Sequence, residues 1–311
     1  MSMTSIRQIN GGEELQGDVR ALLNIVGKDK DAFFNEILNW LLAEAPEDFS
    51  PEILRSSKLV KLVSSAVTVN NELDVPTKTP YLSFVEENNE PFTLKTSGKN
   101  WNGMMEYSVD TQKWIAWSGA EIKSSNDGKL YLRGKRNTTV TTNLSTSNGV
   151  HFTFSLNKRI QCLGNIENLL DYEIVAEGKH PTMQKRCYYY LFASCPSLTT
   201  PPELPATTLT EDCYCSMFAH CTSLSQAPIL PATTLAESCY SSMFTECISL
   251  TQAPELPATT LAYNCYSNIF NKCTSLTGTI HCPASTVSDP NRLDAKANSV
   301  PDNTATVVYD L

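Results

Sequence analysis

Cysteine is the residue type in this sequence whose number and spacing most clearly suggest a chemical role. The chain has eleven cysteines, and ten of them lie beyond residue 186. Eight of the ten form two ladders with a 26-residue step, Cys187, Cys213, Cys239 and Cys265, and Cys195, Cys221, Cys247 and Cys273. Three kinds of chemistry fit: buried reduced thiols that pack as small apolar groups, disulfide pairs, or a metal site. The odd number favours the buried thiols, and the absence of CxxC pairs disfavours the metal.

Histidines are the second group that could do chemistry, as general acids or bases. None of the four recurs between the cysteine units, and none lies in an HExxH or GxSxG motif. They are His151, His180, His220 and His281. We therefore predict no catalytic residues, no metal and no cofactor. An enzyme whose strand-rich part acts on glycans is kept as a minor alternative.

The cysteines belong to a longer repeated unit. The stretch CYSSMFTECISLTQAPELPATTL begins at Cys239, and related stretches begin 26 residues before and after it. Four such units without insertions predict a stacked solenoid over residues 183–285, in which each unit buries its apolar face against its neighbours.

Each unit is predicted to contain a helix. Thr234 and Glu237 fit a capping box at the start of a helix over residues 235–247. Cys239 and Met243 would then share one apolar face with the next Phe and Cys of the unit. A short return segment beside the prolines completes the unit.

Tyrosines follow the first cysteine ladder. Each tyrosine directly follows a core cysteine, and adjacent side chains on a helix point in different directions. We therefore expect the tyrosines at the flank of the solenoid core or on its outer surface. They form either a candidate binding stripe or a cover over the seams between units, and they are Tyr188, Tyr214, Tyr240 and Tyr266.

Residues 81–165 alternate between apolar and polar, which predicts a small antiparallel β sandwich-like domain. Residues 105–109 and 114–117 should form a hairpin, and Asp127-Gly128 is a two-residue hairpin signal. Trp101, Trp114 and Trp117 are candidate glycan-stacking aromatics, with the sandwich core as the alternative.

Residues 1–70 have apolar residues at helical spacing, before a linker at 71–80. The apolar stripe predicts a docking or oligomerisation region, and a compact three-helix bundle is the alternative. The predicted docking or oligomerisation residues are Phe33, Phe34, Ile37, Trp40 and Leu41, although Trp40 lies outside the centre of the stripe. Residues 166–182 are a joint into the repeats, and residues 286–311 are a C-terminal cap or tail.

Composition limits the partners. The net charge of −9 and the lack of a basic cluster disfavour nucleic acid. Residues 183–283 contain nine charged side chains, three basic and six acidic, which suits neutral partners. No apolar run reaches the roughly 18 residues of a membrane span, and no signal-peptide segment is evident. We therefore expect synthesis in the cytoplasm and no membrane insertion.

The pattern CYxxMFxxCxSLxxAPxLPATTL resembles the BspA-like leucine-rich repeats of surface proteins from gut bacteria and their phages. EYSVDTQKWIAW, LYLRGKRNT and GNIENLL are similar to segments that precede such repeats. The resemblance covers about residues 90–285 and implies adhesion or ligand binding at a surface, without shared catalytic residues. It completes the expected fold class: a multidomain chain with an α-helical N-terminal region, a β sandwich-like domain and a short α/β leucine-rich-repeat solenoid.

Bacterial members of this family reach the surface through an export signal, whereas a virion protein assembles in the host cytoplasm. We therefore expect a noncatalytic head or tail fibre protein at the virion surface, favoured as a homotrimer. It would dock on a capsid or other virion protein through residues 1–70 and present its repeats to a host-surface glycan or protein. The alternative is a bacterial leucine-rich-repeat adhesin or interaction scaffold at the cell surface.

Overall fold

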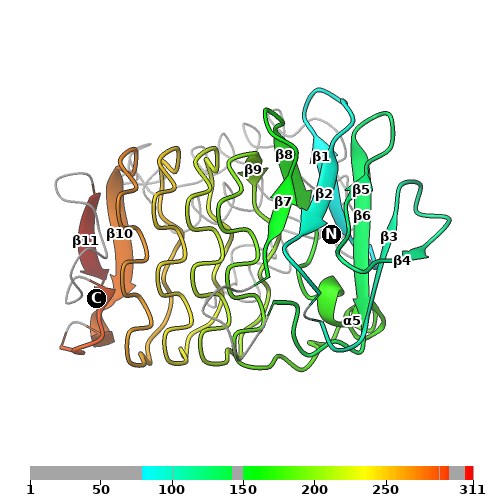
Figure 1. Cartoon of the computed structure of the whole chain (residues 1–311). Coiled ribbons are helices and arrows are strands. Elements are labelled where there is room, and N and C mark those ends of the chain that lie inside the picture. Colours follow the sequence, from blue (N-terminus) through cyan, green and yellow to red (C-terminus); the bar gives the residue numbers. More distant parts are fainter. Residues whose placement is uncertain (1–78, 100, 142–149, 287, 294–304, 311) are drawn as a thin grey trace, which may run out of the picture. The chain divides into compact units, whose positions relative to one another are not determined.

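The computed structural model describes residues 79–99, 101–141, 150–286, 288–293 and 305–310. These residues belong to one compact unit that spans residues 77–311 (Figure 1). The elements in chain order are β1 (Leu82–Glu86), β2 (Thr93–Thr96), β3 (Met104–Ser108), β4 (Ile115–Ala116), β5 (Ile122–Lys123), β6 (Lys129–Lys135), β7 (Phe152–Phe154), β8 (Ile160–Leu163), α5 (Asn168–Ala176), β9 (Leu198–Thr200), β10 (Gly278–Pro283), a 3-10 turn η2 (Ala284–Thr286) and β11 (Ala305–Asp310).

The largest sheet has six strands in the order β4-β3-β6-β1-β8-β9. Its strands are antiparallel except for β8 and β9, which are parallel. Burial alternates along β6, so that Leu130 and Leu132 face the core while Tyr131 and Arg133 face away from it. We call the side of the sheet that carries Tyr131 and Arg133 the outer face.

A three-stranded antiparallel sheet, β5-β2-β7, lies on the core side. Aromatic rings join the two sheets, since Phe84 of β1 is 5.9 Å from Phe152 and 5.4 Å from Phe154 of β7, ring centre to ring centre. Asp127-Gly128 does not join a hairpin as predicted. The turn connects β5 of the small sheet to β6 of the large one. The other predicted hairpin is confirmed, because β3 and β4 pair antiparallel.

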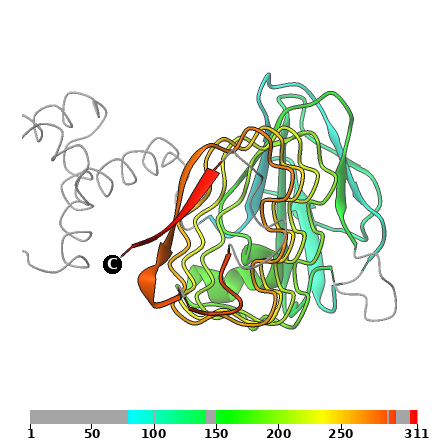
Figure 2. The same ribbon diagram turned by 90° about the vertical axis from the view of Figure 1, so that its left-hand side faces the viewer.

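From Cys187 onward the chain forms four stacked coils, which we call the repeat stack; they begin at Cys187, Cys213, Cys239 and Cys265, and β9 lies in the first of them. Alternate backbone N–H groups donate to the next coil. The Tyr188 N–H donates to the Cys213 carbonyl at 2.9 Å, and the equivalent bonds follow at Tyr214 and Tyr240. The intervening N–H groups close tight turns within the coil, for example from Leu191 to Tyr188. Viewed from the C-terminal end, successive coils nearly superimpose (Figure 2).

The stretch of each coil predicted to be a helix is not helical, because every fourth residue in it has a positive φ. In the third coil these residues are Ser238, Ser242 and Glu246, with φ of 52°, 55° and 60°. A left-handed residue interrupts a right-handed helix, and it turns the flanking peptide groups alternately along and across the stack. The helix predicted over residues 235–247, with its capping box at Thr234 and Glu237, is therefore wrong.

The predicted fold class is contradicted as a whole. The described part of the chain is mostly β structure with a single α-helix, α5, and its sheets are mixed and antiparallel rather than a purely antiparallel sandwich beside an α/β repeat domain. The large sheet continues into the repeats through β9. The helical region predicted for residues 1–70 lies outside the described residues.

Both ends of the repeat stack are covered. On the N-terminal side, the Cys187 carbonyl accepts from the N–H groups of Val140 and Thr141, and the Leu191 carbonyl accepts from Phe152. On the C-terminal side, β11 pairs in parallel with β10. The backbone ladder therefore runs from the strand-rich part through all four coils, without a hinge between them.

Candidate binding surface

The cysteine ladders lie in the core of the repeat stack. All eight residues are at most 2% exposed. The second ladder also makes a repeated hydrogen bond, because the thiols of Cys195, Cys221, Cys247 and Cys273 each donate to a Phe carbonyl of the preceding segment, at 2.9 to 3.1 Å. Burial raises the pKa of the Cys221 and Cys213 thiols to about 12, so neither is a reactive thiolate at neutral pH.

The tyrosine ladder is buried too, which corrects the predicted binding stripe. Tyr188, Tyr214, Tyr240 and Tyr266 are 0 to 3% exposed, and their rings stack in succession at 5.5, 6.0 and 6.3 Å. A parallel row of Phe rings stacks at 5.6 to 5.7 Å. Adjacent Cys and Tyr side chains both enter the core because a left-handed residue precedes each pair, so the helical rule for neighbours does not apply.

The three tryptophans separate into two environments. Trp101 and Trp117 stack on each other at 5.5 Å and are buried, so these two form core rather than a glycan platform. Trp114, at the start of the β3–β4 hairpin's second arm, remains half-buried. It is the one member of the predicted trio that a ligand can reach.

Trp114 belongs to a group that we call the outer-face cluster: Tyr81, Glu106, Trp114, Tyr131, Arg133 and Tyr172. The Arg133 guanidinium carbon lies 3.9 Å from the ring centre of Trp114 and 4.4 Å from that of Tyr172. Its Nε donates to Glu106 Oε2 at 2.8 Å. The side chains of Arg133 and Glu106 stay 19% and 27% exposed. Cation–π contacts and an ion pair thus fix the orientation of the Arg133 side chain at a partly exposed surface.

Two further tyrosines extend this cluster across the sheet. The Tyr81 ring lies 5.7 Å from Trp114 and 5.1 Å from Tyr131, edge to face in the second case. Beside them, Lys135 of β6 pairs with Glu173 of α5. The cluster therefore combines four half-buried rings with charges that are already paired. We infer that it suits a ligand with an apolar face and hydroxyl groups more than an ion.

Sequence reasoning missed Arg133, Glu106, Tyr172 and Tyr81. The signal for the first two was present, because Tyr131 and Arg133 share one face of the KLYLRGK strand and Glu106 lies two residues from the hairpin turn's Ser108. Tyr172 comes from α5, whose position against β6 depends on tertiary structure alone.

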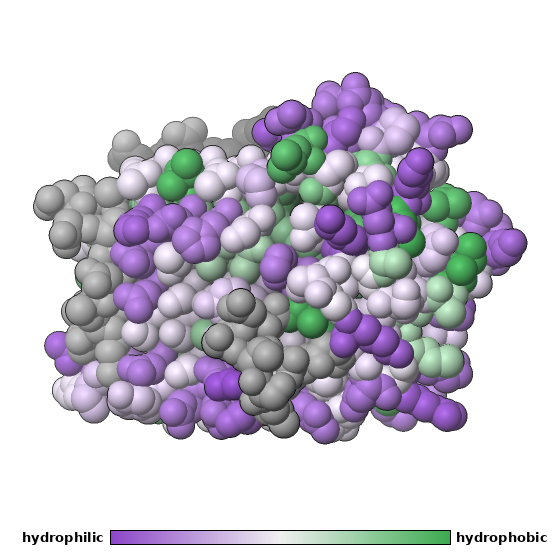
Figure 3. Space-filling model, viewed as in Figure 1, coloured by the Kyte–Doolittle hydropathy of each residue, from purple (hydrophilic) through white to green (hydrophobic). Residues whose placement is uncertain are grey.

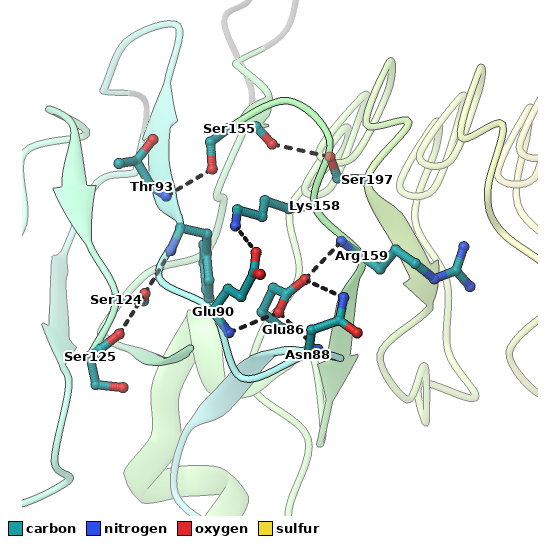
Figure 4. Close-up of polar contacts among 11 residues, drawn as sticks. Glu86, Asn88, Glu90, Thr93, Ser124, Ser125, Ser155, Lys158, Arg159 and Ser197 are labelled. Atoms are coloured by element: carbon teal, nitrogen blue, oxygen red, sulfur yellow. Dashed lines mark hydrogen bonds and ion pairs between the residues drawn. The ribbon is translucent and has the colours of Figure 1, made fainter. Parts of the chain in front are cut away.

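A second polar group, at the junction with the first coil, is structural. The buried Glu86 carboxylate accepts from the backbone N–H groups of Asn88 and Glu90 at 2.8 and 2.9 Å, and at 3.5 Å from that of Arg159 (Figure 4). Burial alone would raise the pKa of this carboxyl, but the backbone hydrogen bonds hold it below its ordinary value. Its polar atoms are satisfied by the fold itself, so the group stabilises the junction.

The histidines take surface and joint positions. His180 lies 2.9 Å from the buried Glu167 carboxylate, whose pKa burial raises, with His180 acting in the opposite direction. His220 and Lys272 flank Glu246 on the surface of the stack. His151 and His281 lie in β regions at intermediate burial. Among the described residues, no three His, Cys, Asp or Glu side chains gather as a metal site would require.

The predicted docking residues Phe33, Phe34, Ile37, Trp40 and Leu41 lie outside the described residues. Within the described ranges, no helix has the length and apolar character to cross a membrane. Comparisons with protein-family models, curated proteins and solved structures give no match.

Proposed function

We propose that this protein is a noncatalytic attachment protein at the surface of a virion, in a head or tail fibre, that presents its β region and repeat stack to host-surface molecules. The observation that carries the proposal is the backbone ladder that runs from the strand-rich part through all four coils. A hydrogen-bonded stack with continuous aromatic rows is stiff, which suits a segment that must hold a binding surface away from its anchor.

The surface chemistry of the stack supports a neutral partner. Its charges are mostly paired between coils, as in Arg186 with Asp212 and Lys272 with Glu246. Its exposed surface is largely polar, while apolar side chains gather near the β3–β4 end (Figure 3). Met104 and Ile115, 55% and 41% exposed, belong to that end. Host glycans or proteins of low charge fit this surface better than nucleic acid does.

Location is tested by immunogold labelling with an antibody raised against the repeat stack, residues 187–283. The proposal predicts labelling of intact virions released by lysis of the cells that make the chain. Labelling of intact cells alone would instead support the alternative, a bacterial adhesin or interaction scaffold. Labelling of neither surface would contradict both functions.

Anchoring through residues 1–70 and trimer formation are part of the same proposal. The chain mass is 34.4 kDa, so light scattering of the full chain should give three times that mass. Aspartate at Phe33 and Trp40 should reduce it to one chain's mass, because charge opposes burial of an apolar stripe. A monomeric wild-type chain would contradict the trimer.

A further inference from the structure

We propose that the outer-face cluster is a binding site for a neutral hexopyranose unit of a host-surface glycan. This inference deepens the proposed attachment function and rests on it, because it names the ligand class and the residues that receive it. It differs from the sequence-based expectation, which placed the aromatic platform on three tryptophans and a tyrosine stripe that are mostly core.

The aromatic rings of the cluster match a sugar ring in shape and chemistry. One side of a pyranose ring is a patch of C–H groups that packs on an aromatic face, while its rim carries hydroxyls. Trp114, Tyr81 and Tyr131 form a half-buried row with centre-to-centre distances of 5.7 and 5.1 Å. The Arg133 guanidinium covers one face of Trp114, so a sugar ring would pack on the part of this row that the arginine leaves uncovered.

Arg133 and Glu106, beside the rings, can form hydrogen bonds with sugar hydroxyls. A guanidinium has five N–H donors, and Arg133 uses its Nε–H for Glu106. Among the described residues, neither its Nη groups nor Glu106 Oε1 makes a further hydrogen bond. The Nη donors of Arg133 and the acceptor Oε1 of Glu106 therefore lie next to each other. Adjacent sugar hydroxyls, each both donor and acceptor, match that pair.

The charges of the cluster favour a neutral ligand. Arg133 is paired with Glu106, and Lys135 is paired with Glu173, so the cluster presents no uncompensated positive charge. A carboxylate or phosphate at the Nη groups would lie beside the Glu106 carboxylate, which already neutralises the arginine and repels a second anion. The site therefore favours neutral sugars over uronic acids.

The Trp114 side chain and the turn before it are held in place by hydrogen bonds. The indole N–H of Trp114 donates to the Thr111 carbonyl at 3.2 Å. The turn before it is fixed by Asp110, whose carboxylate accepts from the backbone N–H groups of Gln112 and Lys113, each at 2.9 Å. A platform that is already ordered loses little conformational entropy when it binds.

The test uses the full chain on an array of oligosaccharides ending in glucose, galactose or mannose, with matched oligosaccharides ending in glucuronic acid. We expect binding to at least one neutral terminus and weaker binding to its glucuronate counterpart. Trp114→Ala should weaken that binding about tenfold or more, because it removes the stacking ring. Tyr263→Ala, which removes an exposed aromatic ring at the end of the third coil, should leave it unchanged.

Glu106→Gln gives a second readout that loss of folding cannot imitate. It frees the Arg133 charge while keeping the side-chain shape, so preference should shift from the neutral sugar toward its glucuronate counterpart. Absence of sugar binding by the wild-type chain, or neutral-sugar binding equally strong in Trp114→Ala, would overturn the site. Immunogold labelling of virions would stand in that case, so failure of the site and failure of the attachment function remain distinguishable.

Discussion

The thiol of Cys221 donates a hydrogen bond of 3.0 Å to the backbone carbonyl of Phe192 in the preceding coil. Cys247 and Cys273 repeat this bond at the 26-residue spacing and Cys195 makes the equivalent bond to Phe152 of β7, so the second cysteine ladder is a row of buried donors rather than a set of reactive thiols. Cysteine fits because it is small, apolar and still able to donate weakly.

Cys221→Ala should therefore destabilise the chain by about 1–2 kcal/mol, since it removes both the sulfur's packing and its bond. Urea unfolding followed by circular dichroism measures the change. Cys215→Ala is the matched control, because Cys215 lies outside both ladders and is only partly buried; we expect less than about 0.5 kcal/mol there. Equal losses at both positions would contradict a structural role for the ladder.

The left-handed conformation at every fourth residue of the stretch predicted to be helical can be tested with glycine. Ser238 has φ of 52°, whereas its neighbour Glu237 is not among the positive-φ residues. Ser238→Gly should leave stability unchanged or raise it by up to about 1 kcal/mol, and Glu237→Gly should lower it by about 0.5–1 kcal/mol. A helical coil would lose stability at both positions, and thermal unfolding distinguishes the two results.

Close packing of α5 against β6 depends on Gly134. A Cβ at this position would lie 1.9 Å from the Leu169 carbonyl oxygen, which is backbone and cannot turn aside. Gly134→Ala should cost about 3 kcal/mol or more, or prevent folding. Gly98→Ala is the control, because the nearest atom to its Cβ is a Val150 methyl at 3.9 Å. A soluble Gly134→Ala chain as stable as the control would refute this packing.

The Glu86 carboxyl should make stability pH-dependent in the acid range. Its pKa in the folded chain is below the ordinary value of 4.5, so the unfolded chain binds the proton more readily. Glu86 therefore adds stability above that pH, and this contribution is lost as the pH falls through the folded pKa. In Glu86→Gln, the urea midpoint should change less between about pH 7 and about pH 3.5 than in the wild type. A pH profile of Glu86→Gln that is unchanged from that of the wild type would contradict the assignment.

The repeat register and the β3–β4 hairpin could be predicted from the sequence, because both depend on local spacing. The coil conformation could not, since Cys239, Met243 and Cys247 recur every four residues in a helix and in this coil alike. Residue types at the positive-φ positions held the missing signal: Asp212, Asn264 and Asn268 tolerate the left-handed region better than most residues.

The candidate site was predictable only in part. Trp114 was identified from its type, but nothing local distinguishes it from Trp101 and Trp117, which the tertiary core covers. Tyr172 reaches Arg133 from α5, 39 residues further along the chain, through packing that no spacing rule reveals.

The most direct test of the attachment function is competition between virions and the soluble full-length chain for host cells. Adsorption of virions should fall as the concentration of soluble wild-type chain rises, while Trp114→Ala should compete about tenfold more weakly. Adsorption that stays constant at saturating wild-type chain would contradict the claim that this protein attaches the virion to its host.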